Sequence, residues 1–210
     1  MPTPPPPALS GRRGQAARND GAILDAAREV FLTDPKAPIA AVAERAGVGI
    51  SALYRRYPGK EDLLRTLCHD GLRRYLTEAE AALAEPDPAA ALRGFLERVV
   101  VADLHALTVN LAGTFTPTPQ MDADAVRAAE LSTALFERAR PALREGLVVD
   151  DLTLVLEGCS AVRMPTPART REIRLRYVEV LFTGLTTDPG RPLPGPPPDA
   201  RELSWRWLDT

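Results

Sequence analysis

The sequence predicts an all-α protein of about nine helices, in which a small N-terminal domain precedes a larger C-terminal one. Two observations carry this prediction. Ala, Leu, Arg and Glu, which favour helices, dominate the chain between its ends. Of the 21 prolines in 210 residues, 11 lie near the two ends and the other ten recur every one or two dozen residues. Because proline stops helices, the inner prolines predict where helices meet. The outer ones predict a disordered Pro/Arg-rich tail at 1–17 and a Pro-rich tail at 188–210.

Charge is distributed unevenly along the chain, although the formal net charge is only -2. Residues 1–75 hold 12 basic and eight acidic side chains, and the remaining residues hold 14 basic and 20 acidic ones. A basic N-terminal part joined to an acidic C-terminal part suggests that a polyanion contacts only the first.

Apolar spacing in the N-terminal part predicts four helices. The first, over residues 20–33, rests on apolar side chains at three- and four-residue intervals: Ile23, Leu24, Ala27, Val30 and Phe31. A second helix follows Pro38 and ends at Gly47, a third covers 50–57, and a fourth covers 60–83. Two short helices joined by a glycine-containing turn form a helix-turn-helix.

The segment from Ile39 to Leu64, IAAVAERAGVGISALYRRYPGKEDLL, resembles the DNA-binding signature of the tetracycline-repressor (TetR) family of bacterial regulators. The resemblance covers residues 19–68 and includes the preceding ILDAAREVF helix. It implies an all-α homodimer with a helix-turn-helix DNA-binding domain, here 18–66, whose fourth helix continues to about residue 84 as a connector. It also implies a regulatory and dimerisation domain, here 67–187. Because most members are repressors that leave DNA when a ligand binds, the resemblance implies a repressor released from a palindromic operator by a small molecule.

The third helix is the expected reading element, because an α-helix fits the major groove. With Leu53 and Tyr57 facing the core, Ser51 and Arg55 lie almost opposite them and are best placed to contact base edges. Arg55 is the first choice for a contact with guanine, while the alternative interpretation is a solvated face. The predicted DNA-binding residues are Ile50, Ser51, Ala52, Tyr54, Arg55, Arg56, Lys60, Arg12 and Arg13.

Tyr54, Lys60 and the two N-terminal arginines are predicted to bind DNA for other reasons. Tyr54 matches a family position that commonly contacts DNA. Lys60 lies in the first turn of a helix, where helix N-termini favour phosphate, and it aligns with a family lysine that contacts the DNA backbone. We therefore expect Lys60 to clamp a phosphate. Arg12 and Arg13 precede the first helix and form either an arm over the groove or a basic disordered tail.

The sequence departs from the family pattern at the starts of three helices. Family members usually carry Ser or Thr there, whereas this chain has Pro38, Gly49 and Gly59. These residues offer no cap hydroxyl. We hypothesise that phosphate contacts at the caps are fewer and shift to Lys60 and the arginines of the third helix.

Four longer helices are predicted in the C-terminal part: 89–115, 124–145 with a kink at Pro141, one from Asp150 or Asp151 to Met164, and 170–185. The last two are apolar around more than one face, which a surface helix does not need. We therefore expect a partner subunit to cover them, as the family's four-helix dimer interface also implies. The predicted dimerisation residues are Leu152, Val155, Leu156, Tyr177, Val178, Leu181, Phe182 and Leu185.

A ligand pocket is expected among the helices of residues 89–164, where polar groups occur in apolar surroundings. The predicted lining residues are His105, Asn110, Thr114, Phe115, Met121, Phe136, Cys159 and Arg163. Each also has a simple packing interpretation. A histidine on a buried helix is more often a satisfied core residue, and Met and Phe usually pack.

Other functional classes find less support. Cys68 and His69 are adjacent and diverge by about 100° on a helix, so they cannot form a nucleophile and base pair, and no catalytic motif is present. We therefore expect no enzyme, no cofactor and no metal site. The sequence holds no apolar run of about 20 residues that would span a membrane and no basic-then-apolar leader, which favours the cytoplasm.

The expected partners are double-stranded DNA, a second copy of the chain and an unidentified small molecule. The competing interpretation is a helical adaptor, or an unconventional enzyme, in which the helix-turn-helix does not bind an operator.

Overall fold

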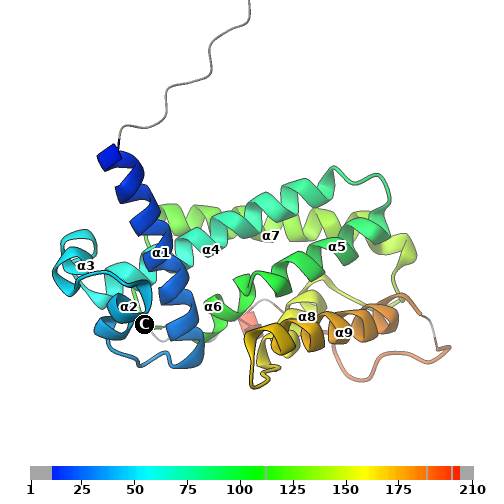
Figure 1. Ribbon diagram of the computed structural model, residues 1–210. Helices are drawn as coiled ribbons and strands as arrows, with labels where there is room; N and C mark the ends of the chain where they lie inside the picture. The colour runs from blue at the N-terminus through cyan, green and yellow to red at the C-terminus, as the bar shows by residue number, and fades with distance from the viewer. Residues whose placement is uncertain (1–10, 112, 188, 200, 204–210) are drawn as a thin grey trace, which may run out of the picture. The chain divides into compact units, whose positions relative to one another are not determined.

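The computed structural model describes residues 11–111, 113–187, 189–199 and 201–203, with the backbone alone for 11–18, 108 and 109 (Figure 1). Within these ranges it contains nine α-helices and one 3-10 turn, and no strand, so the predicted all-α fold class is confirmed. None of the described helices combines the length and the apolarity that crossing a membrane requires. The chain divides into two compact units, Met1–Leu67 and Cys68–Thr210.

The first unit contains α1 (Gly11–Thr33), α2 (Ile39–Ala46), α3 (Ile50–Arg56) and the beginning of α4 (Lys60–Leu83), as far as Leu67. Each helix buries one apolar stripe, and α1 packs along α2. The shared core includes Ile23, Ala27, Phe31, Val42, Leu53, Leu63, Leu64 and Leu67. Periodicity predicts these helices because each has a single buried side.

The first helix is longer than its periodicity predicts. It begins at Gly11 instead of residue 20, so residues 11–17 are helical and not part of a tail. Residues 11–19 carry no apolar stripe, although their Arg, Gln and Ala favour helices, and this explains the difference. Residues 1–10 of the predicted tail lie outside the described residues.

The second unit contains the rest of α4, then α5 (Pro88–Val101), α6 (Leu104–Leu111), α7 (Pro119–Ala139), the 3-10 turn η1 (Arg140–Ala142), α8 (Val149–Ala161) and α9 (Pro167–Thr186). Three of these helices begin with a capping side chain followed by proline. The caps are Asp87 before α5, Thr118 before α7 and Thr166 before α9, and each accepts a backbone N–H of the first turn. Proline fits the first position because that residue's N–H has no partner within the helix.

One predicted helix, 89–115, is two helices in the structure. α5 and α6 are separated at Asp103, whose backbone is left-handed with φ 54°. The Asp103 carboxylate pairs with Arg174 of α9, a buried guanidinium that also donates to the carbonyls of Ser160 at 3.1 Å and Val162 at 2.9 Å. The break therefore accompanies a contact between residues 71 positions apart, which local periodicity cannot reveal.

Two further helix ends differ from the prediction. The helix predicted at 124–145 starts earlier and ends at Ala139, where η1 takes up Pro141, so the proline ends the helix instead of bending it. α8 begins at Val149, and the Asp151 carboxylate accepts a hydrogen bond from the Val148 N–H at 2.8 Å. One of the two predicted capping aspartates thus stabilises this helix start.

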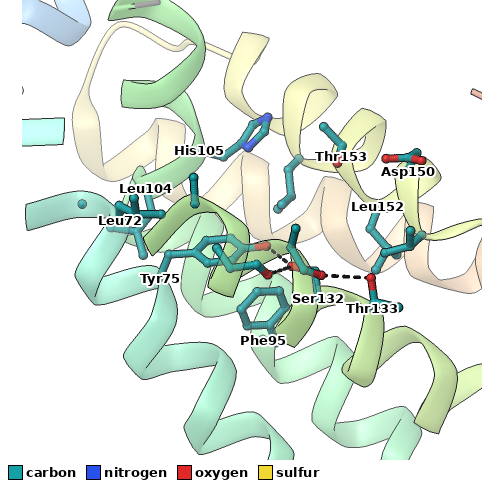
Figure 2. A pocket seen from close by; sticks show the side chains of 16 residues that line it. Leu72, Tyr75, Phe95, Leu104, His105, Ser132, Thr133, Asp150, Leu152 and Thr153 are labelled. Carbon is teal, nitrogen blue, oxygen red and sulfur yellow. Dashed lines mark hydrogen bonds between the residues drawn. The ribbon is translucent and has the colours of Figure 1, made fainter. Parts of the chain in front are cut away.

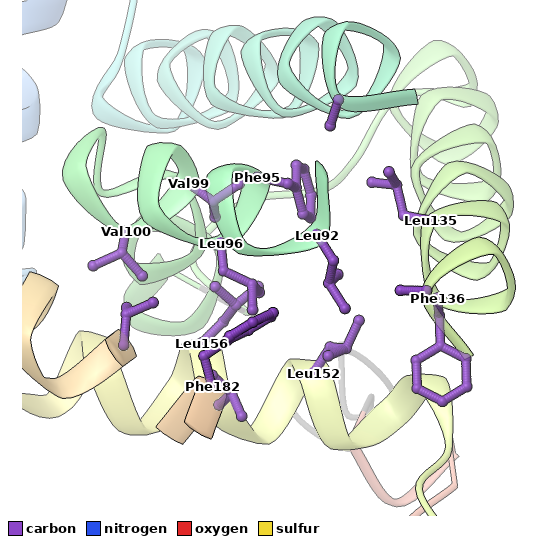
Figure 3. Packing of buried hydrophobic residues seen from close by; sticks show 14 of the residues in the cluster. Leu92, Phe95, Leu96, Val99, Val100, Leu135, Phe136, Leu152, Leu156 and Phe182 are labelled. Carbon is purple, nitrogen blue, oxygen red and sulfur yellow. The ribbon is translucent and has the colours of Figure 1, made fainter. Parts of the chain in front are cut away.

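The core of the second unit is built around α5 (Figure 3). The side chains that meet there are Leu92, Phe95, Leu96 and Val99 of α5, Leu135 and Phe136 of α7, Leu152 and Leu156 of α8, and Phe182 of α9. Truncating a fully buried leucine to alanine typically costs about 2–5 kcal/mol. This cluster therefore fixes the rotation of α5, α7, α8 and α9, and with it the side chains that face elsewhere.

The Pro-rich segment after α9 returns to the second unit. Arg144 donates from its Nη2 to the Arg191 carbonyl at 2.7 Å, and Leu193 packs against the core cluster. The predicted C-terminal tail therefore contributes a side chain to the core. Residues 188, 200 and 204–210 of that tail lie outside the described residues.

Candidate DNA-binding surface and ligand pocket

α3 has one buried and one exposed side, in the orientation that the sequence predicts. Leu53 is fully buried, and Tyr57, just after the helix, is 3% exposed, so both belong to the core of the first unit. The opposite side, which we call the reading face, consists of Ile50, Ser51, Tyr54 and Arg55, all exposed. Ala52 lies at its edge and is half-buried. Two large apolar side chains of this face are open to solvent, Ile50 at 40% and Tyr54 at 48% exposure.

Glycine sets the turn that leads into α3. Gly47 ends α2 with φ 65°, a left-handed conformation that other residues rarely adopt, and the Val48 N–H donates to the Ala43 carbonyl at 3.0 Å. Gly49 before α3 and Pro38 before α2 form no side-chain cap hydrogen bond. The first-turn N–H groups of both helices therefore receive no acceptor from the positions where the family usually has a hydroxyl.

The two arginines at the end of α3 have different surroundings. The Nε of Arg56 donates to Asp20 of α1 at 2.9 Å, and this hydrogen bond and the attraction to the carboxylate raise the pKa of Arg56. Arg55 is exposed and forms no ion pair with any side chain in the described part of the chain. Arg56 is thus tied to the first unit, whereas Arg55 can extend toward a partner.

Lys60 contacts the protein where a phosphate was expected. Its Nζ donates to the carbonyls of Pro35 at 3.0 Å and Ala37 at 2.8 Å, and it lies 5.1 Å from the centre of the Phe31 ring. These contacts close the loop between α1 and α2. They occupy two of the three N–H groups of the ammonium, so at most one is left for a DNA phosphate.

The backbone of Arg12 and Arg13 lies in the first turn of α1 and is not an extended arm. Their side chains lie outside what the structure describes. Their predicted contact with DNA therefore stays a prediction.

The second unit contains a cavity of about 380 Å³ (Figure 2). One wall is a stripe of small residues on α7, at intervals of three or four: Ala125, Ala128, Ala129, Ser132 and Thr133. The facing walls come from Leu72 and Tyr75 of α4, Phe95 of α5, Leu104 and His105 of α6, and Val149, Asp150, Leu152, Thr153 and Leu156 of α8. The small side chains on α7 leave the space that larger ones would fill.

The polar groups of this cavity form a short chain of hydrogen bonds. The Tyr75 hydroxyl lies 2.7 Å from the Ser132 Oγ, which in turn donates to the Ala128 carbonyl at 2.8 Å, and the Thr133 Oγ1 donates to the Ala129 carbonyl at 2.9 Å. The Tyr75 ring meets Phe95 edge-on, with 5.1 Å between ring centres. Burial raises the pKa of Tyr75, so its phenol is neutral near pH 7.

Only His105 among the eight predicted ligand-binding residues lines this cavity. Phe115, Met121, Phe136 and Cys159 are buried in the packing, Thr114 and Arg163 are exposed, and Asn110 is half-buried elsewhere. The prediction selected polar and bulky residues in apolar surroundings, but a cavity forms where side chains are small. The stripe of Ala, Ser and Thr at helical spacing on α7 was the signal in the sequence.

The predicted dimerisation residues prove to be mostly core. Leu152, Val155, Leu156, Val178, Phe182 and Leu185 are buried within the second unit, Leu181 is half-buried, and Tyr177 is 36% exposed. The apolar side chains that α8 and α9 expose are instead Leu154 at 44% and Val180 at 60%, together with Tyr177. Each of the two helices has apolar side chains on two sides. One side packs in the core, so only the other side is available to a partner subunit.

Comparison with known proteins identifies the first unit. Residues 23–67 match the family described as bacterial regulatory proteins, tetR family. The chain is 35% identical over 106 residues to the HTH-type transcriptional repressor LfrR of Mycolicibacterium smegmatis. This match includes 50% of the chain and 54% of LfrR, so the chain spans about half the length of this curated relative.

Solved structures extend the likeness to both units. The structure of LfrR from Mycobacterium smegmatis in complex with proflavine has a TM-score of 0.60 and 26% identity, over 82% of this chain and 99% of that one. The TetR transcriptional regulator SCO0520 from Streptomyces coelicolor has a TM-score of 0.58 and 26% identity, over 80% and 98% of the two chains. These relatives are transcriptional regulators and not enzymes. The helix-turn-helix with its exposed reading face and the family match show that residues 23–67 form a DNA-binding domain of the tetR type, and the shared all-α fold makes both units similar to transcriptional regulators of that family.

Proposed function

We propose that the protein is a homodimeric transcriptional repressor of the cytoplasm that binds a palindromic operator and leaves it when a small molecule occupies the cavity of the second unit. The observation that carries this proposal is the reading face of α3, which exposes Ile50, Tyr54 and Arg55 opposite a buried Leu53. A solvated surface helix has no need to expose two large apolar side chains beside an arginine that has no ion-pair partner among the described side chains, whereas a helix lying in the major groove uses both kinds.

Direct reading of bases falls to three side chains. Arg55 reaches a guanine through its guanidinium, and Ile50 and Tyr54 offer apolar surface to the methyl group of thymine, the only base that carries one in the major groove. Arg56 and Lys60 act mainly by holding the domain together, through Asp20 and through the loop after α1. This proposal departs from the expectation that phosphate contacts shift to Arg55, Arg56 and Lys60, which stays a prediction.

Dimerisation is proposed to use the exposed side of α8 and α9, defined by Leu154, Tyr177 and Val180. The α8 and α9 helices lie against each other (Figure 1), and Tyr177 packs over Gly158, where an added Cβ would lie 3.7 Å from the ring. Leu154 of α8 and Tyr177 and Val180 of α9 are the large apolar side chains that this helix pair exposes, and we propose that a partner subunit covers them.

Selection of bound fragments from a random duplex library tests the proposed function. The expected result is one enriched sequence with two-fold symmetry. The logarithm of its binding constant should fall linearly with the logarithm of the salt concentration. Mobility shifts with the enriched duplex and with a scrambled duplex then measure specificity. If no duplex is bound even at low salt, the regulator proposal is wrong and the helical adaptor takes its place.

A further inference from the structure

Three of the four hydroxyl oxygens that line the cavity can only accept hydrogen bonds from a ligand, because their own protons are already used. Ser132 Oγ gives its single proton to the Ala128 carbonyl, so in its contact with Tyr75 the phenol must be the donor. Thr133 Oγ1 likewise gives its proton to Ala129. Of the four hydroxyl groups that line the cavity, those of Tyr75, Ser132 and Thr133 therefore offer a ligand only lone pairs.

The formal charge in the cavity wall is negative. Asp150 is the one Asp, Glu, Lys or Arg among the lining residues, all of which the structure describes. Its carboxylate is only partly buried and has no hydrogen-bond or ion-pair partner among the described side chains, unlike Asp151, which accepts the Val148 N–H. Figure 2 shows Asp150 at one end of the cavity, beyond Leu152 and Thr153.

The surroundings of Asp150 disfavour its negative charge. Partial burial raises the pKa of Asp150, and the carboxylates of Asp199 and Asp151 raise it further by repulsion. Asp199 belongs to the Pro-rich segment that returns to the second unit, so this segment adds negative potential at the same end. A bound positive charge would offset the repulsion among these carboxylates and favour the charged form of Asp150.

The remaining walls are apolar and partly aromatic. Tyr75 and Phe95 form an edge-to-face pair beside the alanines of α7, and Leu72 and Leu104 close the opposite end from Asp150 (Figure 2). A space of about 380 Å³ lies within the range of small-molecule sites. Aromatic faces attract cations as well as apolar rings.

We propose that this cavity binds an organic cation: an apolar, aromatic molecule with protonated or N–H-bearing nitrogen, whose charge pairs with Asp150 while its N–H groups donate to Ser132 and Thr133. The proposal rests on the proposed function in one respect, that this cavity is the regulatory site. An anionic ligand would meet Asp150 with no lysine or arginine among the lining residues to offset it. A ligand with acceptors alone would find three of the four hydroxyl protons already committed, and only the Thr153 hydroxyl and the His105 ring left as side-chain donors.

Three acridines of one ring size but different charge test the charge preference: 9-aminoacridine, a cation at pH 7.5, acridine, which is neutral, and acridine-9-carboxylate, an anion. Binding to the full chain is measured by fluorescence titration without DNA, because acridines also intercalate into duplexes. The expected order of affinity is cation, neutral ring, anion, with about tenfold between successive members, the size of effect that one charge-assisted contact produces. Equal affinities, tighter binding of the anion or no binding of any acridine overturns the proposal.

Two variants locate the charge. Asp150→Asn is expected to weaken 9-aminoacridine about tenfold and to leave acridine unchanged. Asp122→Asn, which removes the same charge from an exposed position on α7 that does not line the cavity, is expected to change neither. Unchanged thermal unfolding of Asp150→Asn shows that the variant folds. If it folds and still binds the cation as tightly as the parent, Asp150 is not the partner and the proposal fails.

The two proposals fail separately. If the chain binds a selected duplex but shows no preference for the cationic acridine, the ligand class is wrong and the regulator stands. If it prefers the cation through Asp150 but binds no duplex, the ligand class stands and the regulator proposal fails.

Discussion

Arg56 at the end of α3 donates from its Nε to the carboxylate of Asp20 in α1 at 2.9 Å. The two residues are 36 positions apart, and the contact joins the reading helix to the helix that supports it. The ion pair offsets the charge of Arg56, whereas Arg55 has no ion-pair partner among the described side chains. We therefore expect Arg56 to position α3 and Arg55 to contact the bases.

Replacing Arg55 is expected to affect specificity more than replacing Arg56. A bidentate arginine on guanine discriminates by about 1–3 kcal/mol, so Arg55→Ala should lower affinity for the selected operator by about ten- to a hundredfold and relax the preference at one base pair. Arg56→Ala should lower affinity for all duplexes by a similar factor, without changing which base is preferred. Fluorescence anisotropy at a fixed salt concentration measures both.

The matched control is Arg171→Ala, which removes the same charge from an exposed position of α9 in the second unit. If Arg55→Ala behaves like this control, Arg55 belongs to a solvated face.

Ile50 is expected to read a thymine methyl group. Its side chain is 40% exposed on the reading face and carries no hydrogen-bonding group, so only an apolar contact is open to it. Replacing thymine by uracil at the contacted base pair removes the methyl alone and should weaken binding a few-fold. Ile50→Ala should weaken binding to the thymine operator similarly and make the protein indifferent to the uracil exchange.

A double-mutant cycle that combines Ile50→Ala with the thymine-to-uracil exchange shows whether the Ile50 side chain contacts the methyl group. Effects that simply add show that Ile50 and the methyl group do not touch, and then Tyr54→Ala is tested against the same pair of duplexes.

Lys60 is expected to matter for stability before DNA binding. Lys60→Met keeps the alkyl stem beside Phe31 but removes the donor to the Pro35 and Ala37 carbonyls. We expect the free energy of unfolding to fall by about 1–3 kcal/mol. Lys60→Arg keeps a donor at this position and should lower the free energy of unfolding less. Urea unfolding followed by circular dichroism measures the change.

The opposite pattern would restore the interpretation drawn from the sequence. Suppose that Lys60→Met unfolds like the parent, but that the slope of log Kd against log salt concentration for DNA binding falls by about one. Lys60 is then a phosphate clamp.

Val180 is expected to lie in the dimer interface. It is 60% exposed on α9, and Val126 on α7 is 61% exposed, so the two valines are matched in type and in exposure. Val180→Glu should produce monomers, because a partner subunit would bury the new charge without an opposite charge to pair with it. Val126→Glu should leave the dimer intact. Sedimentation velocity distinguishes the two.

Dissociation by Val126→Glu, or dimers that survive both substitutions, would move the interface away from the exposed side of α8 and α9. Loss of operator binding in the monomeric variant is a further expected outcome, since a palindrome needs two reading helices.

The N-terminal unit could be predicted almost entirely, and for a physical reason. Each of its helices buries one stripe, so period and breakers specify the helices, and the spacing of Leu53 and Tyr57 alone orients Ser51 and Arg55 away from the core. The pattern did not predict the hydrogen bonds of Lys60 to the loop after α1 or the ion pair of Arg56 with Asp20. Both contacts join segments that are far apart in the chain.

In the second unit the same reasoning predicted most of the helices, but not which side of each helix is buried. Val178 and Val180 are two positions apart on one apolar helix, yet the first is fully buried and the second is 60% exposed. The sequence by itself determined the all-α fold, the helix-turn-helix and the residues that face away from its core, since these depend on local periodicity. Tertiary packing decided the break at Asp103, the cavity lined by small residues of α7 and the side of α9 left for a partner, because each depends on contacts between segments far apart in the chain.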